Sequence, residues 1–309
     1  MGVYNLSGTR IDEQVFVNVK SFGAKGDGTT NDRSSIQNAL DSVKNTGGVI
    51  YFPVGTYLIQ SAILFYSNQT LWFENGATIL QGASINNLMR SYCDASWTGY
   101  TGTHDCLIYG ATFDGGEYTT DNTLVGIAHC KNIIFENCTF KNGYGTWHNL
   151  EINSSYNIKV INCIHEGSRR TGDGAEMIQI DYCRDAGLYP WTANYDDTVC
   201  NYVEICGCYF SGNTISPAIG NHTNAAHKFA SIHDNIFDGL TSTRGAINFV
   251  SSMTEIDIYD NTFNGCAKGV GSTGATYYIH DNRFVNTTTA ISGSASVAHC
   301  NMINGTYTA

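Results

Sequence analysis

Two short segments of the chain place polar side chains between alternating apolar residues. They read Leu150-Glu-Ile-Asn153 and Ile178-Gln-Ile-Asp181. In a strand whose apolar residues point inward, Glu151 and Asp181 point outward. Glu176 lies just before the second segment. Glycoside hydrolysis needs two carboxyl groups, one as acid and one as base or nucleophile. We therefore predict Glu176, Asp181 and Glu151 as catalytic residues of a polysaccharide-degrading glycoside hydrolase, without choosing between inversion and retention.

Further polar and aromatic residues fall on the same strands or on the loops beside them. The long segment between Cys183 and Cys200 leaves directly after Asp181 and could wall a groove, since long loops on a rigid scaffold often carry function. We predict a substrate-binding set of Trp147, His148, Asn153, Arg170, Asp173, Gln179, Trp191, His222, His227 and Asn248.

Two other functions stay open. A polysaccharide lyase acting on uronic-acid polymers could bind Ca²⁺ through Asp173, Asp181 and Glu176, with Arg169 or Arg170 abstracting a proton. A non-catalytic glycan-binding spike would need neither step. For the hydrolase we expect no cofactor and no metal.

The elements that position these residues repeat along the chain. A short phrase ending in an aromatic ring or a histidine returns many times between Phe113 and Phe284, and such a period indicates a solenoid. Within each repeat, apolar residues alternate as in strands, while Gly and Asn fill the corners. Three parallel strands in each coil predict an all-β, single-stranded right-handed parallel β-helix.

Stacked coils place like residues above one another. We expect Phe140, Phe210, Phe237, Phe263 and Phe284 to stack inside, with His165 as a core histidine in the same stack. An internal amide ladder is expected from Asn137, Asn162, Asn235, Asn261 and Asn282. The thiols of Cys138, Cys163 and Cys208 should also point inward.

Composition narrows the partners and the compartment. The net charge is −11 and no basic stripe occurs, so we expect no nucleic acid. No apolar run is long enough for a membrane span, and the first residues lack the features of a signal peptide. Eleven cysteines, an odd number, indicate folding in a reducing cytoplasm, although Cys183 and Cys200 could bridge the long segment.

One domain is expected, with four parts: a lead-in over 1–17, an N-terminal cap over 18–59, coils over 60–295 and a C-terminal cap over 296–309. The cap should contain a helix over about 33–44, because Ile36, Leu40 and Val43 share one face. Asp32 is the expected helix cap. The aromatic stretch Tyr92–Tyr100 breaks the strand pattern and is expected to project as a loop.

Two sequence motifs near the start of the chain are similar to those of a known family. They are Val17-Asn-Val-Lys-Ser-Phe-Gly-Ala-Lys-Gly-Asp-Gly28 and Gly47-Gly-Val-Ile-Tyr-Phe-Pro-Val-Gly-Thr-Tyr57. They resemble the opening segment of the pectate-lyase-like right-handed β-helix superfamily, particularly its phage tailspike and polygalacturonase-related branches. The resemblance implies a polysaccharide partner in a groove along one parallel sheet. It also implies a virion-tail or extracellular location and allows a homotrimer.

The chain departs from the polygalacturonase pattern. The words Asn-Thr-Asp, Asp-Asp, Gly-His-Gly and Arg-Ile-Lys do not stand at the matching strands, and the pair Asp196-Asp197 lies in the long segment instead. Polygalacturonase activity is therefore not supported, and the superfamily contains hydrolases, lyases, epimerases and adhesins.

Overall fold

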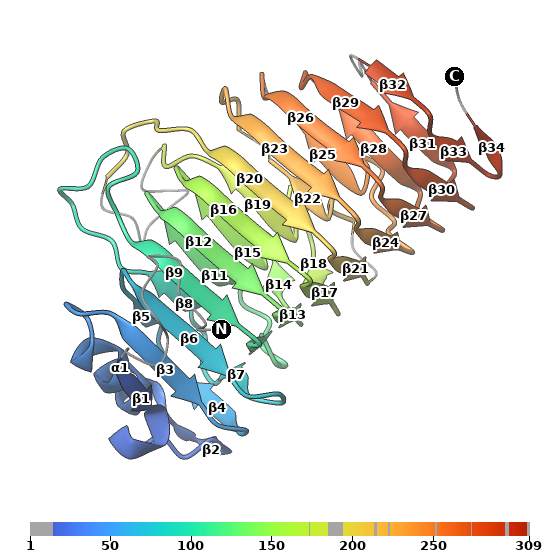
Figure 1. The fold of residues 1–309 in the computed structure, drawn as a ribbon. Helices are drawn as coiled ribbons and strands as arrows, with labels where there is room; N and C mark the ends of the chain where they lie inside the picture. Colours follow the sequence, from blue (N-terminus) through green and yellow to red (C-terminus); the bar gives the residue numbers. More distant parts are fainter. Residues whose placement is uncertain are drawn as a thin grey trace, which may run out of the picture.

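A computed structural model describes residues 15–172, 174–184, 194–212, 215–221, 223–250, 252–272, 274–293 and 297–307. Over these residues the chain forms a right-handed parallel β-helix (Figure 1), which confirms the predicted fold class. Three long sheets, which we name A, B and C, run along the solenoid. The chain passes from sheet A to sheet B to sheet C in each regular coil.

Sheet A carries the predicted site, and its described strands are β5 (Ile63–Phe65), β8 (Asn87–Ser91), β11 (Thr123–Ala128), β15 (Leu150–Asn153), β19 (Ile178–Asp181), β22 (Ile219–Gly220), β25 (Ile247–Phe249), β28 (Lys268–Ser272) and β31 (Thr289–Ser292). Sheet B faces the viewer in Figure 1 and contains β1 (Phe16–Asn18), β3 (Gly48–Phe52), β6 (Gln69–Phe73), β9 (His104–Tyr109), β12 (Lys131–Glu136), β16 (Tyr156–Ile161), β20 (Asn201–Cys206), β23 (Lys228–His233), β26 (Thr254–Tyr259), β29 (Tyr277–His280) and β32 (Val297–His299).

Sheet C closes the triangle with short strands: β2 (Asp27–Asn31), β4 (Thr56–Ile59), β7 (Thr78–Gln81), β10 (Thr112–Asp114), β13 (Thr139–Lys141), β17 (Ile164–Glu166), β21 (Tyr209–Ser211), β24 (Ile236–Asp238), β27 (Thr262–Asn264), β30 (Arg283–Val285), β33 (Met302–Ile303) and β34 (Thr306–Tyr307). A small extra sheet pairs β14 (Tyr144–Gly145) with β18 (Arg169–Arg170). Among the described strands, only β33 and β34 pair antiparallel.

The expected aromatic stack fills the interior behind sheet C. Phe140 pairs in register with His165, and His165 with Phe210. The His165 ring stacks between them at centroid distances of 4.6 and 4.9 Å. Burial lowers the pKa of His165 to about 3, and neither ring nitrogen has a hydrogen-bond partner in the described structure. His165 is therefore a neutral core residue, as predicted.

The predicted amide ladder is correct in one half of the molecule and wrong in the other. Asn235 donates to Asn261, Asn261 to Asn282, and Asn282 to Asn301, each over 2.9–3.0 Å. Two further asparagines, Asn137 and Asn162, are exposed corner residues in the left-handed region instead. In those coils the inward position belongs to Cys138 and Cys163, so the thiols replace the amides.

The corner between sheets B and C is short and uniform. From β9 onward it has two residues in each described coil, the first with positive φ and the second buried. The corners on either side of sheet A vary in length, from two residues between β11 and β12 to nineteen between β19 and β20. In Figure 1 the loop before β9 and the segment before β20 lie at the upper left, and hydrogen bonds join them. Long loops can therefore reach the outer face of sheet A.

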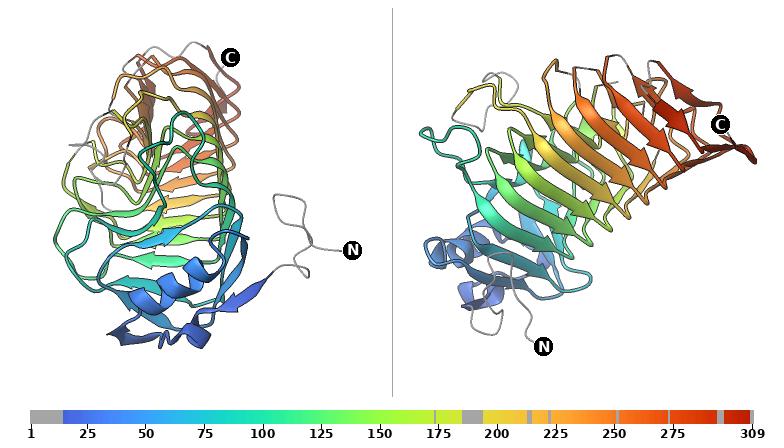
Figure 2. Two further views of the ribbon diagram at one scale, coloured as in Figure 1. Left: turned by 90° about the vertical axis from the view of Figure 1, so that its left-hand side faces the viewer. Right: turned by 45° about the horizontal axis from the view of Figure 1, so that its top comes forward.

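The helix α1 (Arg33–Ser42) confirms the predicted helix, two residues shorter at its end. It lies across the first coils (Figure 2), contacts the short 3₁₀ helix η2 (Val19–Phe22), and buries Ile36 and Leu40 against the core. Asp32 occupies the predicted N-cap position, but its side chain makes no capping hydrogen bond. The Asp32 carboxylate accepts hydrogen bonds from the backbone N–H groups of Lys25 and Gly26, at 2.7 and 2.8 Å, because the preceding turn brings these donors closer.

The coils extend further than the predicted boundaries. Residues 16–18 already pair with β3, and strands from Asp27 onward belong to sheets B and C, so the expected cap is largely solenoid. At the other end β32 and β33 continue the coils beyond residue 295. Within the described residues, no helix has the length and apolar character needed to cross a membrane. The eleven cysteines are thiols, so Cys183 and Cys200 form no bridge.

Candidate functional site

The register of sheet A brings the predicted residues together on one face. Glu151 pairs with Gln179, Gln179 with Gly220, and Gly220 with Asn248, so these positions form one outward column. Asn153 pairs with Asp181 in the neighbouring column. Glu151 and Asp181 thus lie on adjacent strands, two positions apart, as the sequence predicts.

The face is nevertheless covered. Glu176 and Asp181 are 0% exposed, and Glu151 is 4% exposed. Gln179 and Asn248 are buried as well. The sequence predicted carboxylates in an open groove, and the structure places them beneath other parts of the chain. Buried carboxylates are costly unless nearby groups satisfy them, so their neighbours define the site.

Glu176 lies between a histidine and an arginine. Its Oε2 is 3.6 Å from Nδ1 of His148, and its Oε1 is 3.8 Å from Nη1 of Arg244. The same guanidinium donates from Nε to Oδ1 of Asn248 at 3.2 Å. A Cβ on Gly220 would lie 2.1 Å from the Asn248 carbonyl oxygen and 3.4 Å from Cγ of Glu176. Glycine is therefore required beneath this carboxylate.

Arg244 is outside the predicted set of site residues. Its segment, Thr243-Arg-Gly-Ala246, comes just before β25 and has no unusual pattern. The only available signal was its place in a loop leaving sheet A. The structure shows that this loop carries a cation to Glu176 and to Asn248.

Asp181 has a different set of neighbours. Its Oδ2 accepts from Nε2 of Gln179 at 3.2 Å, and its Oδ1 accepts from the backbone of Tyr182 at 3.0 Å. Nε2 of His227 lies 3.8 Å from Oδ1. Nδ1 of His227 accepts a hydrogen bond from the backbone N–H of Cys200, so the neutral ring carries its proton on Nε2, toward Asp181.

Glu151 lies one column away from Asp181, and its Oε2 accepts a hydrogen bond from Oγ1 of Thr123 at 3.1 Å. Thr123 begins β11, the strand that pairs with β15. The three carboxylates therefore lie in three distinct environments on one strip of sheet A. Trp147 is partly exposed in the loop before β15. Three predicted residues, Asp173, Trp191 and His222, lie outside the described residues.

The arginines of β18 hold loops in place. Arg170 donates to the backbone oxygens of Asn122 and Tyr144, at 2.8 and 2.6 Å, and to Oδ1 of Asn149 at 2.8 Å. Burial lowers its pKa to about 9. Arg169 likewise donates to three backbone carbonyls, including that of Gly116. The described contacts make both residues positioning residues for the loops beside sheet A.

Several buried polar atoms of sheet A and of the segments beside it have no hydrogen-bond partner in the described structure. They are both amide atoms of Asn153, Nδ2 of Asn149 and Nε2 of His227. Most buried polar groups in proteins are hydrogen-bonded, so such exceptions mark strained or ligand-binding positions. Here they accompany the predicted carboxylates.

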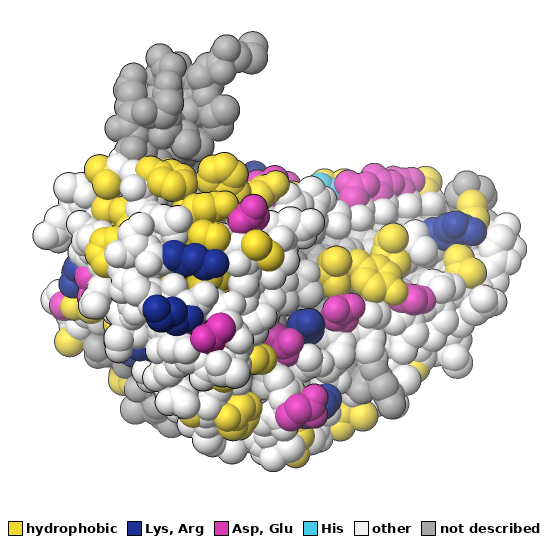
Figure 3. All heavy atoms as spheres, turned by 90° about the horizontal axis from the view of Figure 1, so that it is seen from below, with side chains coloured by type: hydrophobic (Ala, Val, Ile, Leu, Met, Phe, Trp, Pro, Cys, Tyr) yellow, Lys and Arg dark blue, Asp and Glu magenta, His cyan; other side chains and the backbone are white. Residues whose placement is uncertain are grey.

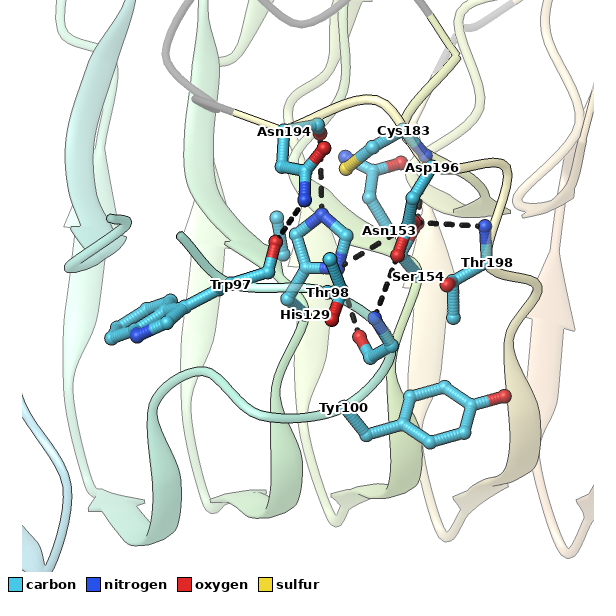
Figure 4. Close-up of polar contacts among 12 residues, drawn as sticks. Trp97, Thr98, Tyr100, His129, Asn153, Ser154, Cys183, Asn194, Asp196 and Thr198 are labelled. Carbon is cyan, nitrogen blue, oxygen red and sulfur yellow. Dashed lines mark hydrogen bonds and ion pairs between the residues drawn. The ribbon is translucent and has the colours of Figure 1, made fainter. Parts of the chain in front are cut away.

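Two loops meet over one end of this face (Figure 4). We name this contact the His129 clasp; it consists of Trp97–Tyr100, His129 and Asn194–Thr198. Nδ1 of His129 is 2.8 Å from the Gly99 carbonyl oxygen, and Nε2 is 3.2 Å from that of Asn194. Both bonds form at once only when both ring nitrogens carry hydrogen.

Asp196 completes the clasp. Its Oδ2 accepts from the Gly99 backbone at 2.7 Å, and its Oδ1 lies 4.0 Å from His129. Burial raises the pKa of Asp196, but hydrogen bonds from Gly99 and Thr198 outweigh burial and lower it overall. The Tyr92–Tyr100 stretch forms the predicted loop, and Tyr100 at its end donates to the Val199 carbonyl at 2.8 Å.

Comparisons with known proteins place this geometry in context. The chain is 30% identical over 295 residues to "Plasmin and fibronectin-binding protein A" of Streptococcus pneumoniae, covering 83% of this chain and 40% of that protein. It is 27% identical over 231 residues to the "Pre-neck appendage protein" of Bacillus phage phi29, covering 64% of this chain and 23% of that protein. The chain thus spans less than half the length of these relatives.

A solved structure of the Streptococcus pneumoniae surface protein and adhesin PfbA superposes with a TM-score of 0.78. The two are 24% identical, and the match covers 94% of this chain and 85% of that one. A family model described as "Rhamnogalacturonase A/epimerase, pectate lyase-like" matches residues 16–302. The chain therefore belongs to the family of rhamnogalacturonase A/epimerase, pectate lyase-like proteins.

Proposed function

We propose that this chain is a glycan-active β-helix protein, and specifically a glycoside hydrolase that acts on a polysaccharide. The observation that carries the proposal is the convergence of Glu151, Glu176 and Asp181 on one strip of sheet A, each with its own polar neighbours. The family description, which includes a rhamnogalacturonase, supports a carbohydrate substrate.

The residues around each carboxylate suggest which one acts as base or nucleophile and which delivers the proton. Glu176 lies 3.8 Å from the guanidinium of Arg244 and 3.6 Å from His148, so we assign it the role of base or nucleophile. Asp181 and Glu151 then share proton delivery, with His227 positioned to exchange a proton with Asp181. Gln179 and Asn248 lie in the same column and would orient sugar hydroxyls.

The test is a reducing-end assay over a panel of neutral and acidic polysaccharides, with wild type beside Glu176→Gln and Asp181→Asn. We expect activity on one polymer to fall by roughly 10²–10⁴ in each variant. Glu166→Gln is the matched control, because Glu166 is exposed on sheet C, away from the site. Activity that survives both site changes, in variants that retain the wild-type circular dichroism, would refute the assignment.

A lyase is distinguished by its product, an unsaturated uronide that absorbs in the ultraviolet. The same panel is therefore read by absorbance with Ca²⁺ and with a chelator. Absorbance that needs Ca²⁺ would favour the lyase, with Asp181 and Glu176 as candidate metal ligands.

One observation favours a third candidate, a non-catalytic glycan-binding spike: the carboxylates are buried, as given above, rather than open to a polymer. The relatives named for binding and for a phage appendage support the same role and an extracellular or virion location. Glycan capture without any new reducing end or unsaturated product would support this candidate. A homotrimer, also proposed, is tested by light scattering.

A further inference from the structure

A second polar cluster lies on the outer face of sheet B, away from the proposed site. There a groove of about 860 Å³ runs over β16, β20, β23, β26 and β29. Lys159, Glu204 and Ser231 form one column along it, while Cys206 and His233 pair in the next column. Tyr202 and Phe229 are exposed beside them. Among the described residues, the groove is lined by these strands and by no long loop, unlike the outer face of sheet A.

Three potential metal ligands converge at one position in this groove. Oε1 of Glu204 lies 3.4 Å from Nε2 of His233 and 3.9 Å from Sγ of Cys206. All three ligand atoms lie within 4.8 Å of one another. Glu204 and Cys206 alternate on one strand, and His233 comes from its neighbour, so the backbone of two paired strands fixes their spacing.

The histidine is already oriented as a ligand. Its Nδ1 lies 2.8 Å from Oδ2 of Asp234, the corner residue that follows it. The ring also stacks on Tyr259 at 4.7 Å, with planes 10° apart. Protein metal sites commonly fix a histidine ligand through such a carboxylate, which leaves the other nitrogen's lone pair for the metal. Here that nitrogen faces Glu204 and Cys206.

The charges around the cluster suit a divalent cation. Nζ of Lys159 lies 2.6 Å from Oε2 of Glu204, which leaves Oε1 for the cluster. With Cys206 as a thiolate, Glu204, Cys206 and Asp234 carry three negative charges and Lys159 one positive charge. A dication brings this group to neutrality. Figure 3 shows acidic side chains in a row along one edge of the molecule, beside a histidine.

We propose that Glu204, Cys206 and His233 form a binding site for Zn²⁺ or a similar borderline-soft dication. One thiolate, one imidazole and one carboxylate are ligands that zinc accepts in a tetrahedral site, whereas sulfur disfavours Ca²⁺ and Mg²⁺. Three protein ligands leave a fourth position toward the groove, for water or for an oxygen of a bound molecule.

The next coils contain a natural comparison without sulfur. Nε2 of His280 lies 3.0 Å from Oδ1 of Asp257, and Nδ1 lies 2.8 Å from Oδ2 of Asp281. This histidine is thus held between two carboxylates at hydrogen-bond distances. Among the described residues no cysteine completes a ligand cluster with it, so His280→Ala is a matched control for removing a surface histidine.

The experiment uses the full chain after chelator treatment and dialysis, titrated with Co²⁺ alone and then with Zn²⁺ in competition. We expect one Co²⁺ per chain, a thiolate-to-cobalt absorption band, and displacement by one equivalent of Zn²⁺. Cys206→Ser should abolish the band. Asp234→Asn should weaken binding by about 10–100-fold, since it removes the carboxylate behind the histidine.

The background is a Cys300→Ser chain, because Cys300 is an exposed thiol. His280→Ala should leave stoichiometry and affinity unchanged. A band that persists in Cys206→Ser, or stoichiometry that falls equally in His280→Ala and His233→Ala, would overturn the proposal. So would the absence of any band in the Cys300→Ser background.

Discussion

The outer faces of sheets A and B are built from the same coils, yet one is covered and the other is open. On sheet A the carboxylates of Glu176 and Asp181 are buried, and on sheet B those of Glu204 and Asp257 line a groove. The pairing of the strands does not explain the difference, since both sheets pair in parallel along the solenoid. The corners between the sheets explain it.

Sheet A has a variable corner at each end of its strands, whereas from β9 onward sheet B has one variable corner and one fixed two-residue corner. Long loops can therefore close over sheet A from both sides, as the His129 clasp does at one end. Over sheet B they can approach from one side only. The length of the corners thus determines whether loops cover the outer face of a sheet. It therefore also determines how accessible a site on that face is to solvent.

Among changes that would disrupt the covered face, we expect the largest effect from Gly220→Ala. The added Cβ would meet the Asn248 carbonyl at 2.1 Å, so the strands beneath Glu176 must shift. We expect a loss of about 3 kcal/mol in the free energy of unfolding, measured by denaturant titration. In Gly172→Ala the Cβ meets only a Thr146 methyl at 3.4 Å, and this control should be nearly neutral. Equal effects would show that sheet A is not packed as described.

A second substitution weakens the His129 clasp, which covers one end of sheet A. His129→Asn keeps a residue that tolerates positive φ but cannot reach both carbonyls. We expect a loss of about 2–3 kcal/mol, because the carbonyls of Gly99 and Asn194 lose their donor. Limited proteolysis should then cleave within 92–103 sooner than in wild type. An unchanged cleavage rate would mean that other contacts hold these loops.

A third prediction concerns His165 in the interior, which makes the folding stability depend on pH. Burial lowers the pKa of His165 to about 3, so the unfolded chain takes up a proton below about 6.5 that the folded chain refuses. Stability is therefore fully present above pH 6.5 and falls as the pH drops toward 3, by about 2 kcal/mol at pH 5. His165→Phe, which continues the ring stack, should remove this component of the acid loss. Parallel pH profiles for the two proteins would contradict the neutral-core assignment.

The smallest effect is expected on the open face. For His280, burial lowers the pKa, but the hydrogen bonds to Asp281 and Asp257 outweigh burial and raise it. The stabilisation is complete below about pH 6.5 and is lost as the pH rises through the raised folded pKa. His280→Phe should thus lower the melting temperature slightly at pH 5.5 and not at pH 9. A difference of the same size at both pH values would assign the effect to packing.

Features that follow from the repeat could be predicted from the sequence. Alternating apolar residues fixed the outward positions of Glu151 and Asp181, and the aromatic phrase located the stack around His165. The one-residue error at Asn137 and Asn162 has a physical cause. Asparagine suits both the left-handed corner and the inward ladder, so residue type alone does not separate adjacent positions.

The sequence could not predict what depends on long loops. The burial of Glu176 requires segments that are distant in the chain to meet, and no period governs those segments. The His129 clasp likewise joins residues 65 positions apart. The cluster at Glu204, Cys206 and His233 could have been found from the repeat, because all three residues lie on regular strands.

The reactivity of the inward thiols can also be used to follow how the molecule unfolds. Burial raises the pKa of Cys163 well above its ordinary value, and Cys138 and Cys208 lie in the same buried row. A protonated, enclosed thiol reacts slowly with alkylating reagents, and the same thiol in an opened coil reacts readily. Because each thiol belongs to one coil, the order in which the cysteines become labelled under mild denaturant would reveal the direction in which the solenoid unwinds.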